Sequence, residues 1–154
     1  MPLTARRTGT LGLGLAATCA VAIGLDAVIA AAAHSAGASD EFEFLHLATY
    51  ARSTVFGVLA GAAGWAVVRA RAARPARALR ILVPVGFLSS FLPNVALAVD
   101  STPPPGTSWT AMSALMVMHV AVAAVAVPAY AWLMPVHDNT PHAPLPDRVA
   151  EVGP

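Results

Sequence analysis

The sequence predicts an all-α protein, a four-helix transmembrane bundle built of two antiparallel hairpins with a flexible C-terminal tail. Of its 154 residues, 57% are hydrophobic and 11% charged, whereas about a quarter of the residues of a typical soluble domain are charged. Four apolar stretches are each long enough to cross a bilayer, which takes about 20 residues. A cluster of arginines divides these stretches into two pairs.

The first predicted span covers residues 11–33 and follows a short polar segment, 1–10, which we expect in the cytoplasm. A cleaved secretory signal is the alternative. We favour an uncleaved span because the apolar run exceeds the usual h-region of about 7–15 residues and contains a charge, Asp26. The lone cysteine, Cys19, lies within this run, so no disulfide can form within one chain.

The second predicted span covers residues 47–69. Asp40 and Glu43 have the spacing of a helix N-cap and its capping-box partner, so we expect a helix to begin there. Gly57, Gly61 and Gly64 form a small-xxx-small pattern, which lets a neighbouring helix approach closely within a membrane. The pattern predicts tight helix packing around this span.

Five arginines lie between the second and third spans, and Pro75 should break the helix among them. They are Arg69, Arg71, Arg74, Arg77 and Arg80. The third span, 81–99, contains Pro84 and Pro93, which predict a kink. The fourth span covers 110–133. The polar, proline-rich segment 135–154 cannot bury enough apolar surface to fold, which predicts a disordered cytoplasmic tail.

Charge placement predicts the orientation, because basic residues near span ends stay in the cytoplasm. With four spans, eight arginines fall on one side and only Arg52 on the other. We therefore expect a multi-pass protein of a bacterial plasma membrane (a cell inner membrane) with both termini cytoplasmic. Its surroundings would be the lipid bilayer, with a homo-oligomer or a membrane-protein partner as further contacts. We expect no nucleic-acid partner, since the basic residues include no lysine and are not interleaved with aromatic ones.

A buried polar layer is the candidate functional site. Counting about 1.5 Å of rise per residue from the span ends places five polar side chains in the outer half of the membrane. They are Asp26, Thr54, Ser90, Asn94 and His119. A carboxylate at this depth costs at least about 2.5–3.5 kcal/mol and should face the bundle and pair, with His119 as the expected partner. Arg52 could reach Asp26 instead. The layer is either interhelical glue or a protonatable pair in a water-accessible cavity.

The second half of the chain carries a resemblance. The segments FLSSFLPNVALA and SALMVMHVAVAAVAVPAY contain Ser89, Ser90, Pro93, the Met118-His119 pair and Pro128. With them, residues 10 to 134 resemble a family of small four-span integral membrane proteins from GC-rich bacteria, described as a domain of unknown function. The resemblance implies a single four-helix membrane domain and supports His119 as a family feature. It implies no activity.

The sequence contains no nucleophile elbow, no metal-binding helix motif and no nucleotide loop, so we do not expect an enzyme. No metal or cofactor is expected, because His137, Asp138 and His142 lie in the tail without a framework. An accessory or structural membrane protein, packing against itself or a partner, is the favoured function. The alternative is a small proton-linked transporter or solute-binding protein that uses the Asp26 and His119 layer.

Overall fold

The computed structural model describes residues 3–136, with side chains from residue 9 onward, and within that range it is helical without strands. The helices are α1 (Leu3–Ser35), α2 (Leu47–Arg71), α3 (Pro75–Ser89), α4 (Leu92–Val99) and α5 (Trp109–Leu133), with one short 3-10 turn, η1 (Glu43–Leu45). The four-helix fold class is confirmed over this range. Most of the predicted tail, from residue 137 onward, lies outside the described residues.

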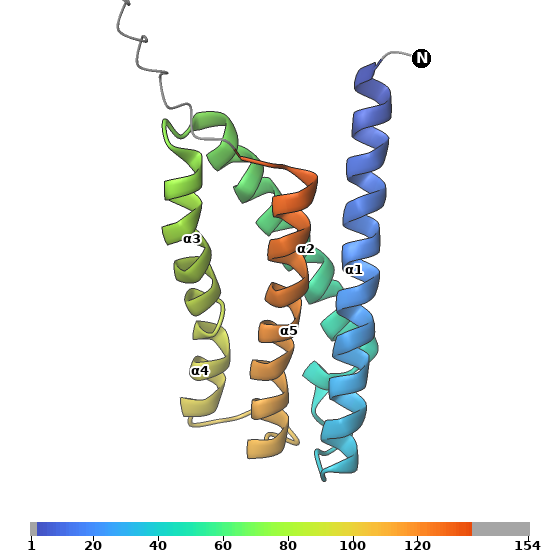
Figure 1. Ribbon diagram of the computed structural model, residues 1–154. Coiled ribbons are helices and arrows are strands. Elements are labelled where there is room, and N and C mark those ends of the chain that lie inside the picture. The colour runs from blue at the N-terminus through green and yellow to red at the C-terminus, as the bar shows by residue number, and fades with distance from the viewer. Residues whose placement is uncertain (1–2, 137–154) are drawn as a thin grey trace, which may run out of the picture.

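Four segments are long and apolar enough to cross a membrane, which makes this a multi-pass membrane protein in architecture. They are Gly9–Ser35, Leu47–Arg71, Pro75–Val99 and Trp109–Leu133. The start of α1, the α2–α3 connector and the end of α5 lie at one end of the bundle, and residues 36–46 and 100–108 lie at the other (Figure 1). The five arginines, all exposed, surround the connector at the first end.

The second helix begins later than the capping-box pattern predicts. Residues 43–45 form the single 3-10 turn η1, and α2 starts at Leu47 without a side-chain cap. Phe42 is fully buried and Leu45 is 3% exposed. Because both side chains must reach the core, the chain crosses the end of the bundle here instead of continuing as a helix. The predicted start at Asp40 is therefore wrong.

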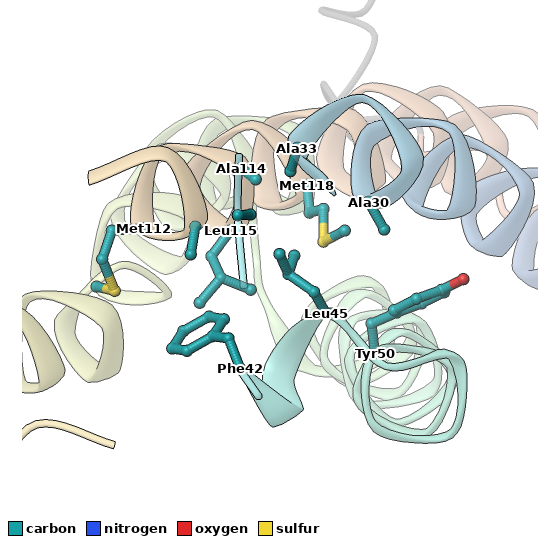
Figure 2. Packing of buried hydrophobic residues seen from close by; sticks show 11 residues of the cluster. Ala30, Ala33, Phe42, Leu45, Tyr50, Met112, Ala114, Leu115 and Met118 are labelled. Atoms are coloured by element: carbon teal, nitrogen blue, oxygen red, sulfur yellow. The ribbon is translucent and has the colours of Figure 1, made fainter. Parts of the chain in front are cut away.

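One core cluster fills the end of the bundle far from the connector. In Figure 2, Phe42 and Leu45 point toward Leu115 and Met118 of α5. Gly106 closes the loop 100–108 onto this cluster, with φ +73° and a position at which a Cβ atom would lie 2.7 Å from the Phe42 backbone nitrogen. Only glycine meets both demands without strain. Aromatic and methionine side chains thus anchor the two loops at this end of the bundle to one core.

A second cluster lies in the half nearer the connector and joins α2 to α5. The Tyr130 hydroxyl donates a hydrogen bond of 2.6 Å to the Val58 carbonyl oxygen, and Trp65 Nε1 donates one of 3.0 Å to the Met134 carbonyl oxygen. A Cβ atom on Gly61 would lie 2.8 Å from the Tyr130 hydroxyl oxygen. The two helices therefore pack against each other at Gly61, one of the three glycines for which the pattern predicts tight packing.

The third span is broken in two, which confirms the predicted kink. Pro75 opens α3 in its first turn, and α3 continues through Pro84 to Ser89. The Ser90 amide still donates to the Gly86 carbonyl oxygen, but a turn then separates α3 from α4. Pro93 lies in the first turn of α4, where its missing N–H is tolerated. The broken span is also the least buried of the four.

Candidate functional site

A cavity of ≈ 690 Å³ lies between α2, the α3–α4 arm and α5, and α1 contributes Asp26 to its lining. This volume lies within the range of about 300–1,000 Å³ typical of small-molecule sites. The cavity exists because the α3–α4 arm packs loosely: Pro75, Leu79 and Asn94 are its buried residues. In Figure 1 the lower part of this arm stands apart from α2.

The wall nearer the connector is apolar and includes four glycines. Gly57, Gly61 and Gly64 of α2 and Gly86 of α3 line it, together with Trp65. A Cβ atom on Gly57 or Gly64 would have no atom within 4 Å. The prediction of tight packing therefore holds for Gly61 alone. The other two glycines leave space for the cavity.

Asp26 supplies the polar end of the cavity. Its side chain is 1% exposed, and the Thr54 hydroxyl donates a hydrogen bond of 2.6 Å to Oδ2. The other carboxyl oxygen, Oδ1, is buried and has no hydrogen-bond partner among the described residues. The large majority of buried side-chain polar atoms in native structures have a hydrogen-bond partner. A buried, half-satisfied carboxyl group beside a cavity is thus an exception that points to a function.

His119 and Asn94 form the second polar group of the lining. His119 Nδ1 lies 2.8 Å from the Leu115 carbonyl oxygen and 3.4 Å from Asn94 Nδ2. A carbonyl oxygen only accepts hydrogen bonds, so the shorter contact places a proton on Nδ1 and leaves Nε2 as the acceptor nitrogen. Rotation of the Asn94 amide then brings its oxygen to the same N–H. The Phe91 ring packs 5.5 Å from the imidazole and fixes its position.

The five residues of the predicted polar layer all line this one cavity, but they do not form one network. Thr54, rather than His119, is hydrogen-bonded to Asp26. Ser90 donates to the Phe87 carbonyl oxygen of its own helix, 2.6 Å away. Among the described residues, no ion pair joins Asp26 to His119 or to Arg52. Arg52 donates instead to the Ala48 carbonyl oxygen.

Tyr50, Phe44 and Phe87 also line the cavity, and depth alone did not identify them. Tyr50 could have been found, because it precedes Thr54 by four residues and therefore shares its helix face. Phe44 belongs to η1, and its position depends on the burial of Phe42 and Leu45. The sequence carries no signal for that turn.

Comparison of the chain with known protein families, with curated proteins and with solved structures finds no match. The resemblance carried by Met118, His119 and Pro128 stays a prediction. Among residues 3–136, no three histidine, cysteine or acidic side chains lie close enough to hold a metal ion together. The metal-ligand types in the tail lie outside this range. The cavity and its buried carboxyl group are what the described chain offers as a functional site.

Proposed function

We propose that this multi-pass membrane protein binds a small, partly apolar solute in the cavity, with Asp26 as the anchoring group, and that it does so without catalysing a reaction. The observation that supports the proposal is the buried, unpaired Oδ1 of Asp26, a residue of the cavity lining. A charged side chain within a bilayer is costly and is retained mainly where it has a function. The sequence alone favoured an accessory role, which gives no reason for a cavity at this carboxyl group.

The orientation predicted from the arginines places Asp26 in the outer half of a bacterial plasma membrane, with both termini cytoplasmic. On this proposal the solute reaches the cavity from the outer side or from the bilayer itself. Ser53, Gly57 and Gly64 line the cavity and are nevertheless exposed, so it is an open groove along α2. A homo-oligomer or a membrane-protein partner would have to leave this groove accessible.

Quenching of Trp65 by brominated probes tests the proposal. Trp65 lines the cavity, whereas the other two tryptophans, Trp109 and Trp132, are 86% and 79% exposed. In a Trp109→Phe, Trp132→Phe background in lipid nanodiscs, Trp65 is the sole tryptophan. A ten-carbon probe with bromine at one end and a polar head at the other should quench it on binding. Saturable quenching by at least one head group is expected.

A matched pair of glycine substitutions separates binding from partitioning into lipid. Gly57→Leu places a side chain in the cavity, and Gly24→Leu places the same side chain on the exposed face of α1, which does not line the cavity. Gly57→Leu should abolish saturable quenching, and Gly24→Leu should preserve it. Equal quenching in both variants would mean that the probes only dissolve in the bilayer. The accessory role would then be the better explanation.

A further inference from the structure

We infer that the solute is an alkylammonium ion with at least one N–H group, whose head hydrogen-bonds to Asp26 Oδ1 and whose apolar body lies along the glycine-lined wall of α2. The inference rests on the proposed function and names the class of solute. Three features of the cavity support it: the carboxyl group at its polar end, the unpaired acceptor oxygen of that group, and the length and character of the apolar wall.

Charge favours a cation. Asp26 is the acidic residue of the cavity lining, and no arginine lines the cavity. The other titratable residues that line the cavity are Tyr50, Tyr130 and His119. His119 Nδ1 contacts the Leu115 carbonyl oxygen. Among the described residues the carboxyl group therefore lacks a cationic partner within ion-pair distance. Burial disfavours the charged form of a carboxyl group that has no such partner, and a bound cation would offset this cost.

The free acceptor selects the kind of cation. Thr54 already donates to Oδ2, so the unpaired acceptor is the buried Oδ1, which needs a hydrogen-bond donor. A primary or secondary ammonium group supplies both charge and N–H, whereas a quaternary ammonium supplies charge alone. Hydrogen bonds between charged groups are roughly twice as strong as neutral ones. Phe44, Tyr50 and Phe87 also line the cavity, and aromatic rings attract cations.

The apolar wall accommodates an elongated body. Thr54 and Trp65 lie eleven residues apart on α2, which corresponds to about 16 Å along the helix. Between them, the space at Gly57 and Gly64 is open, so a hydrocarbon chain can lie close to the helix there, while the Tyr130 hydroxyl packs against Gly61. A head at Asp26 thus places the far end of a ten-carbon chain toward Trp65.

The test uses four probes that share the ten-carbon bromoalkyl body and differ only in the head: primary ammonium, trimethylammonium, hydroxyl and carboxylate. They are titrated into the single-tryptophan protein in nanodiscs, with quenching in the Gly57→Leu variant subtracted as partitioning. The primary ammonium should bind about tenfold to a hundredfold more tightly than the alcohol, as expected for a charge-assisted hydrogen bond. The trimethylammonium and carboxylate probes should bind more weakly than the primary ammonium.

The possible rankings decide the inference. Equal binding of the ammonium and alcohol probes would overturn the inference that the solute is a cation. Equal binding of the primary and quaternary ammonium probes would overturn the inference that it needs an N–H group. Tightest binding of the carboxylate would overturn both. If all heads bind equally and Gly57→Leu abolishes them, the proposed function stands and this inference fails. If none binds saturably, both fail.

The Asp26→Asn variant tests in the same experiment whether ammonium binding depends on this carboxyl group. It keeps the size of the side chain and removes its charge, so ammonium affinity should fall to about that of the alcohol while alcohol affinity changes little. An unchanged ammonium affinity would overturn the inference. The ranking of the four heads on the protein with Asp26 intact does not depend on this variant's folding.

Discussion

At the scale of single residues, Thr54 determines how well the buried carboxyl group is satisfied. Its hydroxyl is the donor to Asp26 Oδ2, at 2.6 Å, and both side chains are less than a tenth exposed. Thr54→Val removes the donor but keeps the shape, which leaves both carboxyl oxygens unpaired. We expect a loss of about 1–2 kcal/mol in the free energy of unfolding. Reversible unfolding in mixed micelles, followed by circular dichroism, measures it.

Two control variants make this prediction specific. Thr54→Ser keeps the hydroxyl and should retain most of the stability. Ser53→Ala removes the neighbouring, exposed hydroxyl, which bonds only to the Thr49 carbonyl oxygen of its own helix, and should change little. In an Asp26→Asn background, Thr54→Val should cost less than in the wild type, because the two side chains are coupled. Additive losses would contradict the hydrogen bond as the source of the effect.

The three glycines of α2 differ in what they contact, so alanine at each should have a different effect. At Gly61 the new methyl group would meet the Tyr130 hydroxyl at 2.8 Å, and at Gly57 and Gly64 it would meet nothing within 4 Å. Gly61→Ala should destabilise the protein by about 1–3 kcal/mol through overpacking. Gly57→Ala and Gly64→Ala should be neutral or stabilising by up to about 1 kcal/mol, because alanine favours the helix.

Tyr130→Phe tests the cause of the Gly61 effect. The hydroxyl oxygen is the atom nearest the new methyl group, so its removal should reduce the cost of Gly61→Ala. Tyr130→Phe alone removes the hydrogen bond to the Val58 carbonyl oxygen and should destabilise the protein. Thermal unfolding of the two single variants and the double variant is the measurement. A full cost of Gly61→Ala in the Tyr130→Phe background would place the clash elsewhere.

At the scale of elements, the length of each apolar stretch predicted the spans, but it does not show in which direction each side chain points. Pro75 and Pro93 revealed the connector and the break, because proline acts through its own backbone. The helix start predicted at Asp40 was wrong, because a capping pattern is local, whereas the burial of Phe42 depends on tertiary packing. Depth grouped Asp26 with His119 correctly on one cavity, but depth does not give the angle around each helix, and only that angle shows that Thr54 faces Asp26.

The break in the third span depends on Pro93. Without an N–H, Pro93 cannot hydrogen-bond to the Ser89 carbonyl oxygen four residues earlier, so the helix has no continuous ladder there. Pro93→Ala should let α3 and α4 join into a straighter helix and lengthen the distance between Val85 and Val99, which are both exposed. Spin labels at these positions in a Cys19→Ala background report it by pulsed electron resonance.

Pro84→Ala is the control for this element. Pro84 lies inside α3, which continues past it, and it precedes both labelled positions. The distance between the labels should therefore stay as in the parent protein. If Pro93→Ala also leaves the distance unchanged, the break is set by packing of Phe91 against His119.

At the scale of the whole molecule, the Asp26 end of the groove and the arginines lie toward opposite ends of the bundle. The five arginines surround the connector, and the Asp26 end of the cavity lies toward the loops at residues 36–46 and 100–108. If basic residues stay in the cytoplasm, a solute bound at Asp26 is nearer the outer surface. Orientation therefore decides on which side of the membrane the solute is recognised.

Cysteine labelling tests this orientation directly. Ala73 lies in the connector and Ser101 in the loop at the opposite end, and both are exposed. In a Cys19→Ala background, Ser101→Cys should react with a membrane-impermeant maleimide on intact spheroplasts, and Ala73→Cys should react only after lysis. Replacing the five connector arginines with glutamine should weaken this difference, because the arginines hold the connector inside. The reverse labelling pattern would place Asp26 in the cytoplasmic half and the solute on the inner side.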